Sequence, residues 1–476
     1  MIRFMVRELL ESIGADGMSL SHTLLDRTLS GVSTDTRTVK PGDIFFGIRG
    51  ERHDGGAFAD DALLAGAILA VVNADTPRAA DPGLPVVRVA DTVRALGNAA
   101  RAYRGRFYGK VAAVTGTNGK TTVKDMLVGA LGTRFPTHGT AGNLNNHIGL
   151  PLSVFGLEKT HERAVFELGM NAPGEIAYLA GVARPEVGVI LNVGPGHMEF
   201  FRDYDEVADS KTELLRALES GGAAVLNADD PLISAREGGA RCRIVRFGVN
   251  APCEFRGEDI TVGPDGCASF RVERRTIRLR VPGAHNVSNA LAAYASARIM
   301  GVGGDAAASA LEVFAAPRMR MQVIERNGVR IINDSYNANP LSMRAAAETL
   351  AFMRLPEGGR LVVALGDMLE LGAISADSHR EVGRMFGMLR PAILCLVGEH
   401  AARYREGALD AGMNKGVIHT FDSVNDALPL LDSVTRAGDT VFVKGSRALG
   451  MERLISGSQV FALQKPGCLT AQNGES

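Results

Sequence analysis

The sequence predicts an α/β protein with three domains, in which mostly parallel sheets are covered by helices. Its 476 residues correspond to roughly three domains of ordinary length. Apolar residues make up 46% of the chain and charged residues 22%, which is typical of a globular protein with a large core. Short β-branched runs alternate with helical patterns along two long stretches, as in parallel sheets. We expect domains over 1–108, 109–315 and 316–464, followed by a polar tail over 465–476.

Composition excludes several classes of function. The net charge is −1, from 52 basic and 53 acidic residues, so no overall field attracts nucleic acid or an anionic membrane. The five cysteines are scattered without a C-x-x-C pair, which disfavours a disulfide framework or a zinc site and favours a reducing compartment. No run approaches 18 apolar residues. We therefore expect a cytoplasmic protein that does not insert into membranes.

The first domain is expected to be a small α/β unit. The runs AILAVVN (67–73) and LPVVRVA (84–90) predict strands, and DTVRALGNAARAYRGRF (91–107) predicts a helix.

The central domain alternates strands with helices, which indicates right-handed βαβ crossovers. Its apolar runs predict strands at 110–116, 163–169, 186–194, 223–227 and 243–249. Helical patterns follow at 175–183 and 204–218. Residues 260–283 read instead as antiparallel strands with a Pro-Asp-Gly turn, and an Ala-rich helix over 285–301 closes the unit.

The third domain shows a second alternation, of the kind found in Rossmann-like folds. Its four apolar runs, with helical patterns between them, predict strands over 330–335, 360–367, 392–398 and 440–446.

A glycine-containing loop follows the first strand of the central domain. The common phosphate loop is G-x-x-x-x-G-K-[ST], but Val114 stands where its first glycine belongs. Backbone N–H groups of such a turn, with the N-terminus of the next helix, bind phosphate. The sequence thus predicts a P-loop-type ATP site, with Lys120 reaching the terminal phosphates and the Thr121 hydroxyl ligating Mg²⁺. The predicted loop comprises Thr115, Gly116, Thr117, Asn118, Gly119, Lys120, Thr121 and Thr122.

Polar residues in two further segments are candidate substrate ligands. Ser33, Thr34 and Arg37 offer hydroxyls and a guanidinium fork for phosphate, although a charged surface loop has the same composition. The amides of Asn143, Asn145 and Asn146 suit recognition of a sugar or a peptide, and an Asx-turn connector is the alternative.

Two side chains stand at strand ends, where ligands bind in doubly wound sheets. Glu167 is suited to Mg²⁺, and His197 follows the next strand. A lone histidine is more often structural, and Mg²⁺ prefers oxygen ligands, so His197 is the weaker candidate. Asn286 and Asn289 share one helix face and suit an adenine edge, with an N-cap and a polar face as the alternative. Lys211 reads by itself as a solvated helix lysine.

Several motifs together resemble the Mur ligase family, which includes folylpolyglutamate synthase. They are T-G-T-N-G-K-T at 115–121, S-T-D-T-R-T-V-K-P-G-D at 33–43, N-L-N-N-H-I-G-L-P at 143–151 and N-D-S-Y-N-A-N-P at 333–340, and the resemblance extends over nearly the whole chain. It implies ATP-dependent joining of an amino acid or peptide to a carboxylate. The C-terminal motifs are most similar to those of members that add D-alanyl-D-alanine to UDP-N-acetylmuramoyl-tripeptide, and the D-N-P-R motif of members acting one step earlier is absent.

The resemblance also implies roles for individual residues. It implies that Ser33, Thr34, Arg37 and Asp54 bind the UDP part of the substrate. It implies that Thr121, Glu167 and His197 bind Mg²⁺, and that a carbamylated Lys211 helps to order a second metal. It places Asn286, Asn289, Arg320, Asp334 and Asn337 around ATP, with Ser335 and Tyr336 facing the cleft, and Lys444, Ser446 and Arg447 on the dipeptide carboxylate. The family usually carries an acidic or amide residue where this chain has His147, which leaves His147 without a role.

The expected reaction proceeds through an acyl phosphate, in a step of peptidoglycan precursor synthesis. Lys120, Glu167, His197, Lys211 and Arg320 are the expected catalytic residues, ATP and Mg²⁺ the cofactors. We expect a monomer and an open form in which Arg320 and Lys120 lie too far apart to act together. The alternatives are another Mur-type ligase, a P-loop switch that forms no bond, and an inactive scaffold. The sequence lacks the N-K-x-D motif of GTPases, and the presence of the catalytic set disfavours the scaffold.

Overall fold

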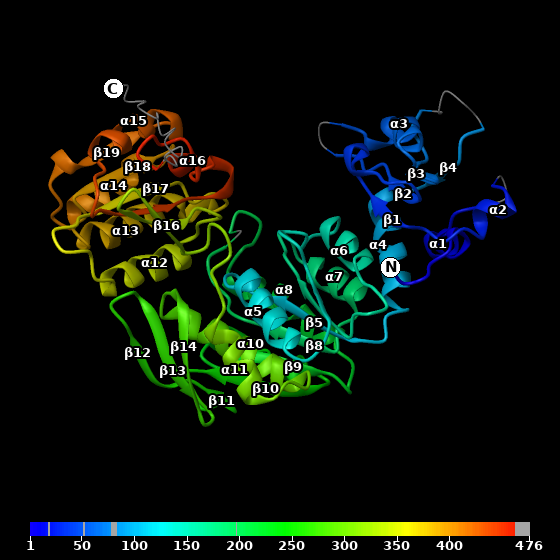
Figure 1. The fold of residues 1–476 in the computed structure, drawn as a ribbon, viewed down its shortest axis with the longest axis horizontal. Coiled ribbons are helices and arrows are strands. Elements are labelled where there is room, and N and C mark those ends of the chain that lie inside the picture. Colours follow the sequence, from blue (N-terminus) through cyan, green and yellow to red (C-terminus); the bar gives the residue numbers. More distant parts are fainter. Residues whose placement is uncertain (18–19, 51–52, 78–82, 197, 462–476) are drawn as a thin grey trace, which may run out of the picture.

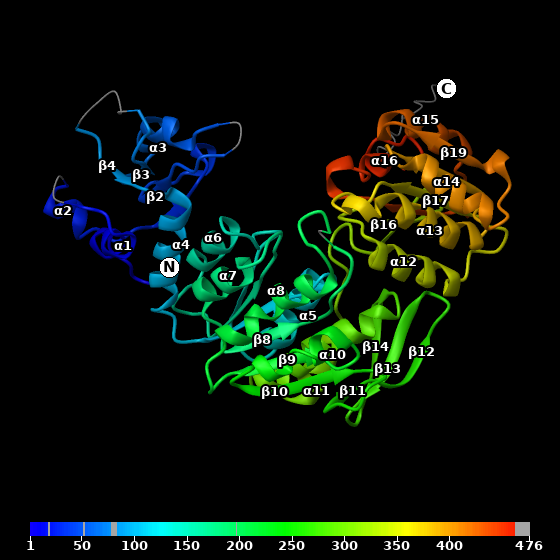
Figure 2. The ribbon, with the colours of Figure 1, turned by 180° about the vertical axis from the view of Figure 1, so that it is seen from behind.

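The computed structural model describes residues 1–17, 20–50, 53–77, 83–196 and 198–461. Three units form an arch, in which the N-terminal and C-terminal units stand on opposite sides of the central unit (Figure 1). The view from behind shows the same separation (Figure 2). The expected α/β class with several mostly parallel sheets is confirmed, whereas the domain limits proposed from the sequence stay predictions.

The N-terminal unit contains a parallel sheet in the order β1-β2-β3-β4. Its strands are β1 (Gly31–Ser33), β2 (Asp43–Phe46), β3 (Leu69–Asn73) and β4 (Val86–Val89), and its helices are α1 (Val6–Ile13), α2 (His22–Leu25), α3 (Ala59–Leu64) and α4 (Thr92–Arg104). Helix α4 begins after Asp91, whose carboxylate accepts from the Val93 and Arg94 N–H groups. The buried Tyr103 hydroxyl on α4 donates to Leu157 O at 2.7 Å, so α4 attaches this unit to the central one.

The central unit is built on a seven-stranded parallel sheet in the order β11-β10-β9-β8-β5-β7-β6. Its strands are β5 (Lys110–Thr115), β6 (Thr137–Gly139), β7 (Arg163–Glu167), β8 (Val187–Ile190), β9 (Ala223–Asn227), β10 (Arg243–Gly248) and β11 (Phe255–Arg256). Its helices are α5 (Lys120–Gly132), α6 (Gly149–Phe155), α7 (Glu175–Ala183), α8 (Tyr204–Ala217) and α9 (Pro231–Ser234). Because β5 pairs with both β7 and β8, the residues that follow these three strands meet at one edge of the sheet.

An antiparallel sheet and two helices complete the central unit. The predicted antiparallel segment forms β12 (Glu258–Val262), β13 (Cys267–Val272) and β14 (Arg275–Pro282). Helix α10 (His285–Ile299) follows and is almost entirely buried, and α11 (Gly304–Glu312) packs beside it.

The third unit has six strands in the order β15-β16-β20-β17-β18-β19, and only β15 runs antiparallel to its neighbour. Its strands are β15 (Gln322–Arg326), β16 (Val329–Asp334), β17 (Leu361–Gly366), β18 (Ile393–Val397), β19 (Ile418–Phe421) and β20 (Thr440–Lys444). Its helices are α12 (Pro340–Phe352), α13 (Ser375–Met388), α14 (Ala401–Asp410), α15 (Val424–Val434) and α16 (Arg453–Ser456). The four predicted strands are confirmed, and the edge strands β15 and β19 are additional.

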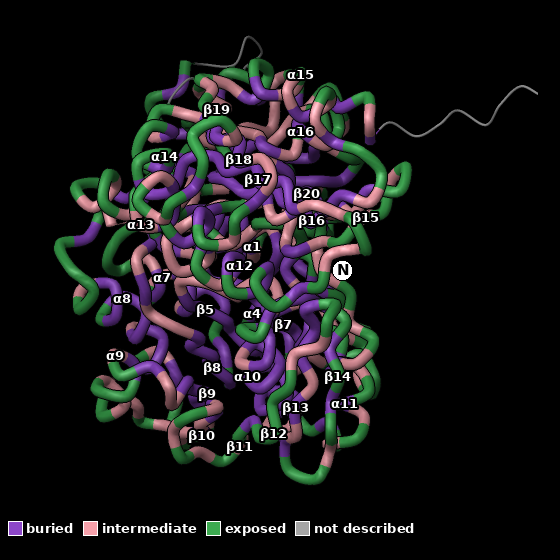
Figure 3. The backbone as a smooth tube through the Cα atoms, turned by 90° about the vertical axis from the view of Figure 1, so that its left-hand side faces the viewer, coloured by how far each residue is buried: buried purple, intermediate pink, exposed green. Residues whose placement is uncertain are grey.

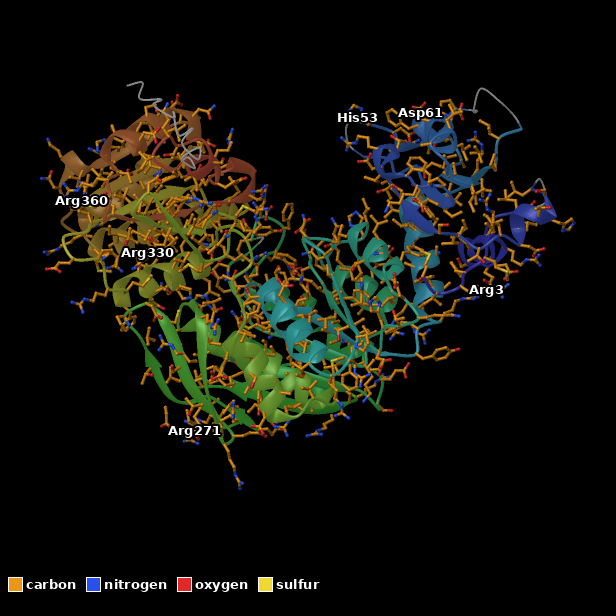
Figure 4. The ribbon with its side chains drawn as sticks, viewed as in Figure 1. Arg3, His53, Asp61, Arg271, Arg330 and Arg360 are labelled. Carbon is orange, nitrogen blue, oxygen red and sulfur yellow. The ribbon has the colours of Figure 1, made fainter. Side chains whose placement is uncertain are left out.

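The central strands of the parallel sheets form the cores of the three units and are buried, whereas the edge strands β12 and β15, the outer helices and the loops are more exposed (Figure 3). Charged side chains cover the outside; Asp61 lies on the N-terminal unit, Arg271 on the antiparallel sheet, and Arg330 and Arg360 on the third unit (Figure 4). Among the helices of the described residues, none is long and apolar enough to cross a membrane.

Candidate active site

A cleft of about 840 Å³ lies between the central and third units. It collects polar residues that the sequence analysis had proposed from widely separated motifs. Those of the central unit that line it are Thr117, Asn118, Gly119, Lys120, Thr121, Thr122, Asn143, Asn145, Asn146, Glu167, Asn286 and Asn289. Those of the third unit are Arg320, Asp334, Asn337, Lys444, Ser446 and Arg447.

The phosphate loop joins β5 to α5 as predicted. Gly119 precedes the helix with φ +85°, a conformation that favours glycine. The Lys120 ammonium donates to Gly116 O at 2.9 Å and Thr117 O at 3.1 Å. Burial lowers the pKa of Lys120, the Glu167 carboxylate opposes that shift, and Arg320 adds to it. The loop therefore presents a desolvated cation at the start of a helix, which suits a polyphosphate.

Glu167, the last residue of β7, lies beside the phosphate loop and is only 2% exposed. One carboxylate oxygen accepts from the Thr121 hydroxyl at 2.7 Å. The other accepts from the Asn145 amide at 2.7 Å. The Glu167 N–H donates to the Thr140 hydroxyl at 3.0 Å. The carboxylate is thus fixed in position by side chains from two other segments.

The donors of Thr121 and Glu167 fit a magnesium site. Both supply oxygen, which Mg²⁺ prefers, and Mg²⁺ in nucleotide sites usually takes one or two carboxylates together with phosphates and waters. The part of the chain that the structure describes holds no cluster of three acidic, histidine or cysteine side chains. The proposed ligand His197 lies outside the described residues.

Lys211 lies on α8, and it is buried instead of solvated, with 2% exposure. Burial, together with the nearby Lys120 charge, lowers its pKa well below the usual lysine value. A buried lysine without compensation favours its neutral amine. The sequence pattern alone gave no indication of this burial.

Arg320 reaches from the third unit onto the phosphate loop. Its guanidinium donates to the Thr121 hydroxyl at 2.9 Å and lies 3.9 Å from the centroid of the Tyr336 ring. The flanking residues Met319 and Met321 both adopt positive φ, +60° and +51°, so the turn carries backbone strain at this residue. The expectation of an open form with Arg320 far from Lys120 was wrong: Arg320 contacts the residue next to Lys120, because the third unit docks on the central one.

Residues at the ends of β16 and β20 support this turn. The buried Lys444 ammonium donates to Asp334 Oδ2 at 2.6 Å and to Asn337 O at 3.0 Å. The other Asp334 oxygen accepts from the Met321 N–H at 3.0 Å. The ion pair of Lys444 and Asp334 therefore holds the segment that carries Arg320, which the sequence analysis had not anticipated for Lys444.

Ser446 and Arg447 follow β20. The Ser446 hydroxyl accepts from the Leu369 N–H at 2.9 Å. The half-exposed Arg447 donates to Glu452 at 2.7 Å. Both side chains line the cleft, and their role on the dipeptide stays a prediction.

Asn286 and Asn289 are buried at the start of α10. The Asn289 amide donates to Asn286 Oδ1 at 2.9 Å, and the Asn286 amide donates to Pro282 O at 2.8 Å. Asn289 Oδ1 lies directly against Gly119. The predicted shared helix face is confirmed. Asn289 also contacts the phosphate loop at Gly119.

The predicted N-terminal ligands do not line this cleft. Ser33 is buried, and its hydroxyl bonds with the Thr38 hydroxyl at 2.9 Å. Arg37 pairs with Asp35, which lowers the pKa of that carboxyl to about 2. Asp54 accepts from Arg49 at 2.7 Å and from the Gly56 N–H at 2.9 Å. Thr34 follows Ser33 directly, and all four residues belong to the N-terminal unit.

Two features of the cleft escaped the sequence analysis. One is the stacking of Arg320 on Tyr336, and the other is an amide pair between Asn118 and Asn339. The Asn-Pro dipeptide at 339–340 indicates a helix start, but no local pattern names a partner more than 200 residues away.

Three family models match the chain. "Mur ligase family, catalytic domain" matches residues 28–104, "Mur ligase middle domain" matches residues 114–297, and "Mur ligase, glutamate ligase domain" matches residues 319–447.

Curated and solved proteins are similar over nearly the whole length. UDP-N-acetylmuramoyl-tripeptide–D-alanyl-D-alanine ligase of Bacillus subtilis is 34% identical over 90% of this chain and 92% of the relative. A crystal structure of MurF from Acinetobacter baumannii superposes with a TM-score of 0.86 at 31% identity, covering 96% of this chain and 98% of that one. MurF ligase from Thermotoga maritima in complex with ADP gives a TM-score of 0.76 at 28% identity, covering 90% and 96%.

Proposed function

The chain belongs to the Mur ligase family, and we propose that it is the member that adds D-alanyl-D-alanine to UDP-N-acetylmuramoyl-tripeptide while ATP is converted to ADP and phosphate. The observation that carries this proposal is the contact of Arg320 with Thr121, which closes the third unit over the phosphate loop. The choice of substrates is supported by the similarity, over nine-tenths of the chain, to UDP-N-acetylmuramoyl-tripeptide–D-alanyl-D-alanine ligase of Bacillus subtilis.

A carboxylate must be activated before an amine can attack it, because oxide is a poor leaving group. A tripeptide carboxylate oxygen attacks the γ-phosphorus of ATP, ADP leaves, and an acyl phosphate forms. The amine of D-alanyl-D-alanine then attacks the acyl carbon and loses a proton, and phosphate departs with the electron pair of its bond. The chain contributes positioning and charge compensation. Lys120 and Arg320 lie where they offset the charge on the transferred phosphoryl group.

We propose Thr121 and Glu167 as ligands of Mg²⁺, and the family resemblance suggests His197 as a further ligand. When bound, the ion neutralises phosphate charge and aligns the transferred group. The Thr121 hydroxyl has two lone pairs; Arg320 uses one, which leaves the other for the metal.

Lys211 is proposed to be carbamylated. The neutral amine is the form that reacts with CO₂, and burial together with the Lys120 charge favours that form. The carbamate would place an anion beside the Lys120 cation, so that the two side chains attract each other.

The remaining contacts follow the positions of the side chains. Asn286, Asn289, Asp334 and Asn337 border the ATP end of the cleft, and Asn143 and Asn146 border the peptide. Lys444 positions this part of the cleft through its bonds to Asp334 and Asn337. Ser446 and Arg447 bind the dipeptide carboxylate there. Ser33, Thr34, Arg37 and Asp54 bind the UDP group on the N-terminal unit, away from the ATP site. We propose a monomer of three domains, divided at 108/109 and 315/316, that acts in the cytoplasm.

Phosphate release from ATP tests the proposal. The purified chain is given UDP-N-acetylmuramoyl-tripeptide with D-alanyl-D-alanine, with a single amino acid, or with no amine. We expect continuous release only with the dipeptide. Release that ignores the dipeptide, or that requires a single amino acid, would refute the assignment.

A further inference from the structure

Two asparagine side chains join the phosphate loop to the third unit. The Asn118 amide donates to Asn339 Oδ1 at 3.2 Å, and the Asn339 amide donates to Asn118 Oδ1 at 2.8 Å. Each side chain is partly buried, and each amide uses both its donor and its acceptor. The pair forms only when the third unit lies on the central unit.

The backbone of Asn118, in the phosphate loop, is held in place by Asn192. Its N–H donates to Asn192 Oδ1 at 2.8 Å, and the Asn192 amide donates to Asn118 O at 3.1 Å. Asn192 follows β8, so the backbone of Asn118 is fixed to the sheet by both of its polar groups. The side chain alone is available to the third unit.

Asn339 is fixed equally firmly to α12. Its Oδ1 accepts from the Ser342 N–H at 2.8 Å, while its own N–H donates to the Ser342 hydroxyl at 3.0 Å. This capping box places Asn339 at the N-terminus of the helix. The pair therefore links the phosphate loop directly to the N-cap residue of α12.

We propose that Asn339 is a positioning residue that couples the phosphate loop to the docking of the third unit and so brings Arg320 into place. The inference rests on the proposed function, since it assigns the docked arrangement to the ligase reaction. Arg320 and Asn339 contact loop residues only three positions apart, Thr121 and Asn118. Backbone hydrogen bonds from Arg354 N–H to Pro264 O at 2.8 Å and from Glu199 N–H to Glu370 O at 3.2 Å also join the two units. The contacts of Arg320 and Asn339 are the ones that fix the third unit on the phosphate loop itself.

Two substitutions separate this role from helix capping. Asn339→Ser keeps a good N-cap but removes the amide that bonds to Asn118. Asn339→Asp keeps the cap and one acceptor but places a carboxylate oxygen against Asn118 Oδ1. Asn118→Ala removes the pair from the other side and leaves the backbone bonds to Asn192.

We expect Asn339→Ser to lower kcat about ten-fold, the value for two hydrogen bonds of ordinary net strength, and Asn339→Asp to lower it further. The KM for the UDP-tripeptide should stay within about two-fold and the melting temperature should be unchanged, because the cap is retained. The double variant Asn118→Ala with Asn339→Ser should be no slower than either single variant by more than about two-fold, as expected for partners of one interaction.

Small-angle X-ray scattering tests the coupling without turnover. With a non-hydrolysable ATP analogue and Mg²⁺, the wild type should contract relative to Asn339→Ser. Equal scattering, unchanged kcat, or effects that multiply in the double variant would overturn the inference. A lowered melting temperature in both Asn339 variants would assign the residue to capping alone. A wild type that contracts but makes no product would refute the proposed function and leave the coupling supported.

Discussion

Arg320 donates to the hydroxyl of Thr121 at 2.9 Å, and the same hydroxyl donates to Glu167 at 2.7 Å. One side chain of the phosphate loop therefore links a cation of the third unit to a carboxylate of the central unit. Arg320 lies 199 positions from Thr121 along the chain, so their contact depends on how the two units dock. This contact organises the cleft, because it joins the phosphate loop to both walls.

Lys120 should be indispensable. Lys120→Ala removes the cation expected on the terminal phosphates, and we expect phosphate release to fall by at least about 100-fold, as for loss of one preorganised transition-state donor. Lys110→Ala is the matched control, because Lys110 is exposed at the start of β5, the strand that precedes the loop, and the variant should retain full activity. Phosphate release at the wild-type rate in Lys120→Ala would refute the role assigned to the phosphate loop.

Tyr336 should act through Arg320. Its ring centroid is 3.9 Å from the guanidinium carbon, a stacking contact worth about 1–2 kcal/mol when desolvated. Tyr336→Leu should therefore lower kcat roughly ten-fold, and Tyr336→Phe should stay close to the wild type since the ring is kept. Steady-state kinetics of both variants decide the matter, and equal losses would show that the hydroxyl is what counts.

Gly119 should not tolerate a side chain. Its φ is +85°, and an added Cβ would overlap Asn289 Oδ1. We expect Gly119→Ala to weaken ADP binding by more than about ten-fold, measured by isothermal titration calorimetry, because the strained loop must shift. Gly129→Ala is the control: nothing lies near its added Cβ, so it should bind ADP normally and stabilise α5 by about 1 kcal/mol. Equal ADP affinity in both variants would contradict the tight fit.

Asn145 should affect metal binding. It donates to one oxygen of Glu167 at 2.7 Å, and partners of this kind are typically worth about 10–100-fold in metal affinity. Electron paramagnetic resonance of Mn²⁺ titrated into the ADP complex should show weaker binding in Asn145→Ala. Asn143→Ala, exposed in the same segment, should bind Mn²⁺ like the wild type. If both variants bind Mn²⁺ alike, Asn145 acts only on the substrate.

His379 should make stability depend on pH. Its ring is fully buried, accepts from the Met368 N–H at 3.0 Å and donates to Ser375 O at 2.6 Å, an arrangement that needs the neutral ring. Burial lowers the pKa of His379 to about 4. The unfolded chain therefore takes up the proton first, and the stabilisation, complete above pH about 6.5, is lost as pH falls toward 4.

The test compares urea unfolding at pH 7.5 and pH 5. On these pKa values, the contribution of His379 falls by about 2 kcal/mol between the two conditions. The wild type should lose about that much more free energy of unfolding than His379→Gln. Parallel losses in the two proteins would mean that His379 is not buried in neutral form.

Local signals predicted the strand, loop and helix of the nucleotide site, because the spacing of glycine, lysine and threonine acts over a few residues. They also placed Glu167 correctly at a strand end, since strand order makes such ends converge. Edge strand β15 was missed because its residues alternate between half-buried and exposed and give little apolar signal.

Contacts between units were beyond sequence reasoning. The open form was expected because a three-domain arrangement suggests closure around the substrates, and the sequence carries no signal for how closely the third unit docks. The partners of Asn118 and Arg320 depend on how the third unit docks on the central one, and a single chain carries no periodic pattern that encodes that docking. The burial of Lys211 was likewise unreadable, because α8 packs against residues distant in sequence.

The most direct measurement gives the enzyme ATP, UDP-N-acetylmuramoyl-tripeptide and a mixture of D-alanyl-D-alanine with single amino acids, and identifies the product by mass spectrometry. We expect one product, the UDP-linked pentapeptide, formed in equal amount to ADP. A product extended by a single amino acid, or ADP formed without any extended peptide, would contradict it.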